Sequence, residues 1–244
     1  MSGLRFGVIA CRVLTRELSL AIAAGSNTCQ IRWLPQGLHD TPDVLRHRLQ
    51  TEIQLFEEEA AALPVHRRPD AILLGYGLCG GGTAGLRAGS LPLVIPRTDD
   101  CIGLLLGSQQ RYLSLFERYQ GVYWFSGGWL EHADTPSRAY YARKRKEYTT
   151  AYGAEAAAWL LEEETRWISN YHTAAYISSP DCCNAPFCAQ AQQAAAAFGW
   201  QFEQVCGSRK LLDALLAGEW DPTVFYVCPP HQTTAQSYDL QKFR

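Results

Sequence analysis

The stretch DAILLGYGLCGGGTAG, residues 70–85, indicates the fold class of this chain. Its apolar part, Ala71-Ile72-Leu73-Leu74, is continuous rather than alternating, and Leu93-Val94-Ile95 repeats the pattern. Continuous apolar runs are typical of strands covered on both faces, as in a parallel sheet between two layers of helices. The glycines that follow predict a tight turn at the carboxyl end of such a strand.

Segments with the apolar pattern of strands alternate with segments that have the apolar spacing of helices along the rest of the chain. Besides 70–76, strands are predicted at 5–11, 30–34, 92–97, 121–126, 173–178, 202–206 and 223–228. Helices are predicted to begin at Thr41-Pro42-Asp43 with Thr41 as cap, from Cys101 to Phe116, from Ala154 to Tyr171, and after Pro186 and Ser208. We therefore expect a single α/β domain over residues 1–244, with a mainly parallel sheet flanked by helices. A helical excursion is expected around 126–152, and a two-lobed division would fall near 126–172.

Composition excludes several classes of protein. The 244 residues carry a net charge of −2, whereas a nucleic-acid-binding domain would show a basic surface. No segment reaches the roughly 18–20 apolar residues of a membrane span, and the apolar run at 6–10 is too short for a signal peptide. A cytoplasmic location is expected. Nine cysteines in a reducing compartment predict metal ligands, catalytic thiols or buried small residues rather than disulfides.

Three thiols follow predicted strands in a way that favours a common site. Cys11 ends the first strand, Cys79 follows the third within the glycine-rich loop, and Cys101 follows the fourth. Ligands of open α/β sheets bind beyond the carboxyl ends of the strands, so these thiols are expected to converge, with Cys206 and Cys228 as further strand-end thiols. Three thiolates suit a four-iron, four-sulfur cluster with one open iron, or zinc or another soft metal. The alternative is that these cysteines are buried small hydrophobic residues.

The glycine-rich loop admits three interpretations. Its six glycines in residues 75–85 let the backbone approach a ligand closely, so Gly77, Gly80, Gly81, Gly82 and Thr83 are candidate cofactor-binding residues. A Walker phosphate loop is disfavoured because the Lys of that motif is missing. A simple tight turn is the second interpretation. In the third, loop N–H groups lower the pKa of Cys79 and make it a nucleophile.

Charged residues beside these thiols are candidates for catalysis. Asp100 precedes Cys101 and would cap a helix or act as a general base if burial raised its pKa. Arg97 could bind a carboxylate or phosphate bidentately. A second thiol cluster comprises Cys182, Cys183 and Cys188, and the strand ending at Cys228 is followed by His231. Whether these groups join the first site is left open by the sequence.

The chain resembles a prokaryotic group of proteins, domain-of-unknown-function family 1638. The residues that carry the resemblance are Leu38-His39-Asp40-Thr41-Pro42, Leu45-Arg46, residues 75–79, Thr83-Ala84-Gly85-Leu86-Arg87, Val94-Ile95-Pro96-Arg97, Asp100-Cys101-Ile102, Leu106-Gly107-Ser108, Gly128-Trp129 and residues 167–171. The resemblance implies that Cys11, Cys79 and Cys101 belong to the family pattern. It implies that the cluster at 182–188 does not, and that a His usually stands where this chain has Asp99. Members often accompany corrinoid-dependent methyl-transfer systems, which implies one-carbon metabolism.

These observations support three hypotheses about function. The first is a thiolate-ligated metal or iron–sulfur protein, either an enzyme or an accessory factor in methyl, one-carbon or sulfur metabolism. The second is an enzyme that binds a small anionic molecule and uses Cys79 as nucleophile. The third is a non-enzymatic partner of a corrinoid methyltransferase system. The expected partners are a small-molecule substrate or metal cofactor, with further copies of the chain also allowed, and neither nucleic acid nor membrane.

Overall fold

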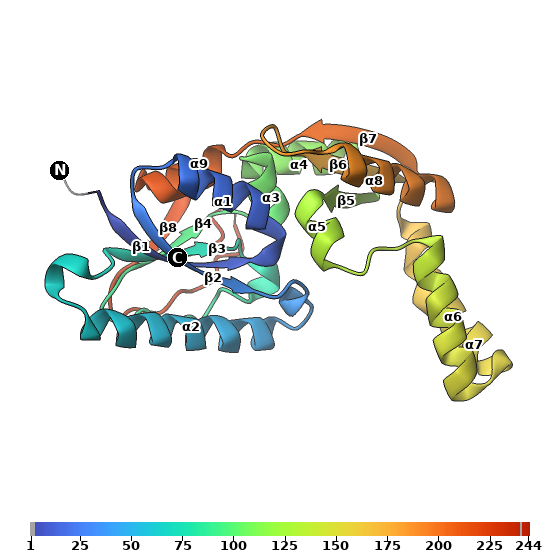
Figure 1. Ribbon diagram of the computed structural model, residues 1–244, viewed down its shortest axis with the longest axis horizontal. Helices are drawn as coiled ribbons and strands as arrows, with labels where there is room; N and C mark the ends of the chain where they lie inside the picture. Colours follow the sequence, from blue (N-terminus) through green and yellow to red (C-terminus); the bar gives the residue numbers. More distant parts are fainter. Residues whose placement is uncertain (1–2, 240) are drawn as a thin grey trace. The chain divides into compact units, whose positions relative to one another are not determined.

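The computed structural model describes residues 3–239 and 241–244, which fold into two compact α/β units (Figure 1). The first unit contains the described residues up to Tyr112 together with those from Gly207 onward, and the second contains Leu113–Cys206. The two ends of the chain thus build one unit, and the second is inserted between them. The division falls at 112/113 and 206/207, outside the range 126–172 suggested by the sequence.

The sheet of the first unit has five strands in the order β2-β1-β3-β4-β8. The strands are β1 (Arg5–Cys11), β2 (Thr28–Leu34), β3 (Ala71–Gly75), β4 (Leu93–Pro96) and β8 (Phe225–Cys228). The first four are parallel, and β8 runs antiparallel to β4 along the edge. All five residues of β3 are buried, as a strand covered on both faces requires. The predicted α/β class with a mainly parallel sheet is confirmed.

Helices cover both faces of this sheet. They are α1 (Thr15–Ala24), α2 (Pro42–Ala62), α3 (Cys101–Leu106) and α9 (Lys210–Ala217), with 3-10 turns η1 (Arg12–Leu14), η2 (Leu38–Asp40), η3 (Val65–Arg67) and η4 (Cys79–Gly81). Helices α1 and α9 pack together on one face, and α2 lies across the other (Figure 1). Gly7 of β1 makes room for α2, because a Cβ there would lie 3.0 Å from the ring of Phe56.

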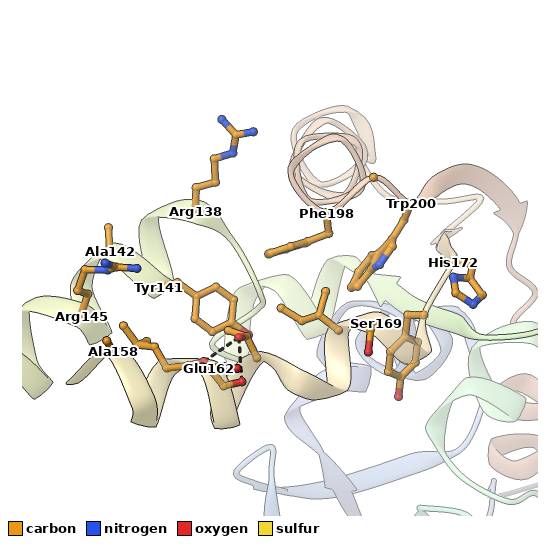
Figure 2. Close-up of a pocket in the computed structure, with 15 residues that line it drawn as sticks. Arg138, Tyr141, Ala142, Arg145, Ala158, Glu162, Ser169, His172, Phe198 and Trp200 are labelled. Atoms are coloured by element: carbon orange, nitrogen blue, oxygen red, sulfur yellow. Dashed lines mark hydrogen bonds between the residues drawn. The ribbon is translucent and has the colours of Figure 1, made fainter. Parts of the chain in front are cut away.

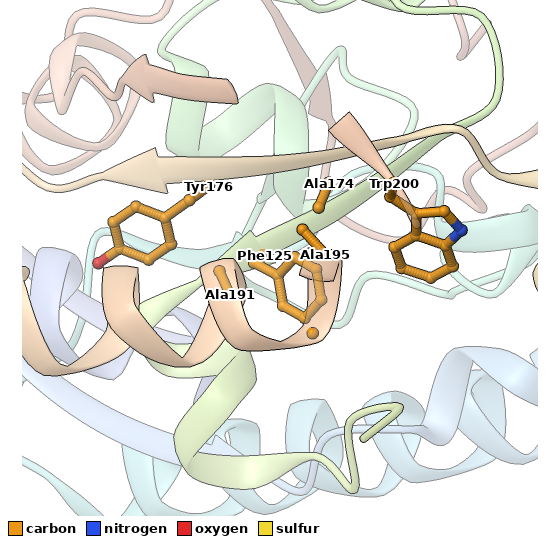
Figure 3. Close-up of a cluster of buried hydrophobic side chains, with 7 residues drawn as sticks. Phe125, Ala174, Tyr176, Ala191, Ala195 and Trp200 are labelled. Carbon is orange, nitrogen blue, oxygen red and sulfur yellow. The ribbon is translucent and has the colours of Figure 1, made fainter. Parts of the chain in front are cut away.

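The second unit is a three-stranded parallel sheet with helices. Its strands β5 (Val122–Ser126), β6 (Thr173–Ser178) and β7 (Gln201–Cys206) pair in sequence order. Its helices are α5 (Gly127–His132), α6 (Arg138–Tyr152), α7 (Ala154–Thr165) and α8 (Ala185–Phe198), with the 3-10 turn η5 (Arg166–Asn170). Figure 3 shows Phe125, Tyr176 and Trp200 packed with alanines of β6 and α8 in a buried core. The predicted helical excursion at 126–152 corresponds to α5 and α6, and α6 pairs with α7 as a hairpin.

Two predicted helices differ from the structure, one in its interior and one at its first residues. The helix expected from Cys101 to Phe116 is broken into α3 and α4 (Gln109–Arg118) at Gly107, whose φ of 72° ends α3 in the left-handed conformation. The predicted cap at Thr41 is wrong in its chemistry. Helix α2 does begin at Pro42, but the Thr41 side chain makes no capping hydrogen bond.

None of the described helices combines enough length and apolar character to cross a membrane.

Candidate functional site

The three predicted thiols lie beyond the carboxyl ends of neighbouring parallel strands. Cys11 is the last residue of β1, Cys79 opens η4 after β3, and Cys101 opens α3 after β4. From β1 the chain moves outward to β2 and then crosses to β3 on the other side. The border between β1 and β3 is therefore the topological switch point of the sheet, where open α/β folds bind ligands.

The three thiols are close enough to influence each other's ionisation. Burial is the largest cause that raises the pKa of Cys101, followed by the negative charges of Asp100, Cys11 and Cys79. Burial likewise raises the pKa of Cys79, with contributions from Asp100 and Cys11. The pKa of Cys11 is raised by burial, while hydrogen bonding with Val13 and Tyr76 lowers it. In the absence of a cation, the site therefore favours three protonated thiols.

The expectation that the loop lowers the pKa of Cys79 is wrong. A hydrogen bond from the Gly77 backbone does lower it, but this effect is smaller than the desolvation of the sulfur and the repulsion by Asp100. Cys79 is only 8% exposed. A buried thiol beside a carboxylate lacks the electropositive surroundings that activate a nucleophilic cysteine.

The glycine-rich loop holds Cys79 in an unusual backbone conformation. Cys79 has a φ of 47°, followed by Gly80 at 65° and Gly81 at 90°. The left-handed region is disfavoured for a residue with a Cβ, so the surrounding structure must hold Cys79 there. Its N–H donates to the carbonyl of Asp99 at 2.7 Å, and the N–H of Leu78 donates to Thr98 at 2.8 Å. These bonds tie the loop after β3 to the segment after β4, which carries Cys101.

The other candidate residues of the loop form internal hydrogen bonds. The N–H groups of Gly81, Gly82 and Thr83 donate to carbonyls of Leu78 or Cys79. The buried hydroxyl of Thr83 donates to the carbonyl of Gly77 at 2.9 Å. These amides are therefore already paired, which leaves the anion-cradle interpretation with little support. The loop instead fixes the position of the Cys79 side chain.

Asp100 connects the thiols to a hydrogen-bond network. Its carboxylate accepts from the N–H of Ile102 at 2.8 Å, which caps α3, and from the hydroxyl of Tyr112 at 3.2 Å. Burial raises the pKa of Asp100 above its ordinary value, although both hydrogen bonds lower it. The carboxylate thus lies where its charge acts on Cys79 and Cys101.

Tyr76 is the residue that the sequence did not single out. Its ring is 4% exposed, and its hydroxyl has no hydrogen-bond partner of normal geometry among the described residues. Its pKa is raised by burial and then by the negative charges of all three cysteines, so its ionisation is coupled to theirs. The sequence feature that could have identified Tyr76 is its position, immediately after a fully buried strand and at the start of the glycine-rich loop.

Arg97 and Asp99 are bound to other parts of the same unit. The Arg97 guanidinium donates to backbone carbonyls and lies over the ring of Tyr226. Those carbonyls belong to Pro222, Phe225, Gln241 and Phe243. The Asp99 carboxylate accepts from Gln109 at 2.6 Å and pairs with Lys242. Arg97 therefore binds the C-terminal segment through these hydrogen bonds. They do not support its predicted role in binding a carboxylate or phosphate.

The remaining cysteines do not extend this cluster within the first unit. Because β8 is antiparallel to β4, Cys228 pairs with Leu93 at the amino end of β4. Cys101 follows the carboxyl end of β4, so the two cysteines lie at opposite ends of the strands. The sequence left open whether Cys228 joins the three thiols, and the antiparallel direction of β8 places it at the other end of the strands. His231 follows it, with its N–H bonded to the carbonyl of Gly89. Cys182, Cys183, Cys188 and Cys206 belong to the second unit.

Alkylation is expected to reveal the raised pKa values. The thiolate is the reactive form, so a pKa above 9.0 keeps Cys79 and Cys101 protonated and slow toward iodoacetamide at pH 7. In metal-free protein their rates should rise only as the pH increases beyond about 9. Mass spectrometry can follow each cysteine, with exposed Cys183 as an internal control. Faster labelling of Cys79 than of Cys183 at pH 7 would contradict this account.

Comparisons with known proteins agree with the family resemblance. The family model described as protein of unknown function, DUF1638, matches residues 33–216, which include Cys79, Asp100 and Cys101. No curated protein and no solved structure matches the chain. The match extends over most of both units. The chain belongs to the DUF1638 family.

Proposed function

We propose that this protein binds a thiophilic metal centre through Cys11, Cys79 and Cys101, with an iron–sulfur cluster as the first candidate and zinc or another soft ion as the alternative. The observation that carries the proposal is the grouping of three thiols and a buried carboxylate whose pKa values are all raised. Such a group of acids repels its own charges and is stabilised by a cation.

The residues fit such a centre in their chemistry. Thiolates are the preferred ligands of iron–sulfur clusters and of zinc, and three of them leave one coordination position open. The buried hydroxyl of Tyr76 lies near the Cys11 thiol but forms no hydrogen bond of ordinary geometry among the described residues, so it is able to donate one to a sulfide or an exogenous ligand. Among the described residues, no three His, Cys, Asp or Glu side chains already surround one point as ligands. The proposal therefore requires that the thiols move together on binding, or that the bound group spans them.

Each side chain then has a distinct part. The three cysteines would hold the centre, Asp100 would add negative charge while it orders the start of α3, and Tyr76 would be able to donate a hydrogen bond to the bound group. When bound, a soft metal centre would supply electron transfer or Lewis-acid activation of a sulfur atom. We further propose that this serves methyl, one-carbon or sulfur metabolism, either in an enzyme or in an accessory factor of a corrinoid methyltransferase system. Cys79 as a free nucleophile is less well supported, because the pKa of its thiol is raised.

Metal content tests the proposal directly. Protein purified without oxygen should contain iron and acid-labile sulfide, or zinc, at about one centre per chain. Replacing Cys11, Cys79 and Cys101 together by serine should reduce the metal content at least tenfold, because hydroxyls are poor ligands for soft metals.

Cys29→Ser is the matched control. Cys29 lies on β2, is partly buried, and its raised pKa is attributed to burial alone. Its substitution should leave the metal content unchanged, and circular dichroism should show folded protein for both variants. Metal-free wild-type protein after anaerobic purification and reconstitution, or equal metal content in the triple variant, would refute the proposal.

A further inference from the structure

A groove in the second unit has the features of a ligand site. It has a volume of about 890 Å³ and lies between the α6–α7 hairpin, η5 and the turn from α8 to β7. All of its lining residues lie between Arg138 and Trp200, so the groove belongs to the second unit alone. A volume of this order accommodates a small organic molecule.

Aromatic rings form one side of the groove. Figure 2 shows Tyr141, Phe198 and Trp200 in succession, with Arg138 and Arg145 toward one end and His172 toward the other. The centroids of Tyr141 and Phe198 are 6.1 Å apart, and those of Phe198 and Trp200 are 5.2 Å apart. Trp200 is 7% exposed and belongs to the core cluster, so this side is anchored to the sheet. Fixed aromatic side chains offer stacking surface at little cost in conformational entropy.

Among the described residues, some basic residues of α6 interact with neighbouring side chains, and others do not. Arg143 pairs with Asp134 at 3.0 Å, and Lys144 lies over the rings of Tyr140 and Tyr148. Within the described part of the chain, the side chains of Arg138 and Arg145 have neither an ion pair nor a hydrogen bond. They are seven residues apart, which is about two helical turns, and both line the groove. Both residues therefore border the groove that the aromatic rings also line.

We propose that this groove binds a planar heteroaromatic ring that carries an acidic group, of which a nucleoside monophosphate is the simplest example. The ring would stack against the aromatic side, and the phosphate or carboxylate would accept hydrogen bonds from both Arg138 and Arg145. Glu162 also lines the groove and can accept N–H groups of the ring, while it disfavours a bare anion. The site is independent of the thiol centre, because its lining residues lie entirely in the other unit.

Calorimetric titration of the full chain with adenosine monophosphate, adenosine and inorganic phosphate tests the proposal. Adenosine monophosphate should bind saturably at one site, and the other two compounds at least tenfold more weakly, because each lacks one half of the recognised group. Arg138→Ala and Arg145→Ala should each weaken the binding of adenosine monophosphate about tenfold, and higher salt should weaken it further.

Lys146→Ala is the matched control, since Lys146 is exposed on the same helix and does not line the groove. It should change the affinity less than twofold, and circular dichroism should confirm that all three variants are folded. The proposal is overturned if adenosine monophosphate does not bind at millimolar concentration, if adenosine binds equally well, or if Lys146→Ala loses as much affinity as Arg145→Ala. The triple serine variant of the thiol site should bind adenosine monophosphate normally, so the two proposals fail separately.

Discussion

Gly77→Ala is expected to destabilise the first unit by about 3 kcal/mol and to disrupt the thiol site. A Cβ at residue 77 would lie 2.5 Å from both the carbonyl oxygen and the hydroxyl of Thr98, and 2.8 Å from the N–H nitrogen of Asp100. Two of these atoms belong to the backbone and cannot rotate away. The loop after β3 would have to separate from the segment after β4, breaking the hydrogen bonds that join Leu78 and Cys79 to it. Urea unfolding measures the loss of stability, and metal content measures the loss of the site.

Gly25→Ala is the control for this substitution. The nearest atom to a Cβ there is the carbonyl oxygen of Ala21 at 3.3 Å, and the φ of −79° is one that alanine adopts. Its effect should stay below about 1 kcal/mol, within the range of ordinary surface changes. If Gly77→Ala unfolds at the same urea concentration as Gly25→Ala, the close approach of the two segments is not as described.

Arg97→Ala is expected to destabilise the protein by about 2–3 kcal/mol while leaving the thiol centre able to bind metal in the folded fraction. The guanidinium lies 2.9 Å from the carbonyl oxygen of Pro222 and 2.8 Å from that of Phe243, so one side chain joins two C-terminal segments. Removing it leaves partly buried carbonyl oxygens without their charged donor. Thermal or urea unfolding, followed by metal analysis of the folded protein, measures the two effects separately.

Lysine should not restore this stability, because a single ammonium cannot reproduce the planar fork of donors. Arg12→Ala, at an exposed position of η1, should change stability by less than about 0.5 kcal/mol. A stable Arg97→Ala protein that has lost metal or ligand binding would instead support the part in catalysis or binding that the sequence suggested.

The strands were predictable from local sequence to within a few residues. All eight predicted strands exist, and the first and sixth have the predicted bounds, Arg5–Cys11 and Thr173–Ser178. Continuous apolar runs can form only buried strands or buried helices, and the flanking glycines and charged residues limit their length. The break at Gly107 was missed because the apolar spacing continues through it, while the positive φ that ends α3 is a property of the backbone.

The partition into two units could not be predicted from periodicity. No linker composition marks the boundaries at 112/113 and 206/207, and helix α4 itself spans the first of them. The direction of β8 is likewise set by its pairing with β4. This direction places Cys228 at the amino end of β4, whereas the three thiols lie beyond the carboxyl ends of the parallel strands. Strand direction depends on long-range hydrogen bonds, which leave no local pattern in the sequence.

The sequence by itself determined which thiols follow strands, and parallel strands then bring Cys11, Cys79 and Cys101 to one edge of the sheet. Only the tertiary structure decided the pKa values, and so the protonation state, of these thiols. The pKa of a thiol depends on its burial and on charges supplied by other segments, such as the carboxylate of Asp100. The same is true of the buried phenol of Tyr76, whose neighbours come from three separate strand ends. Local sequence specifies the elements, but the packing between elements sets the electrostatics of the site that they form.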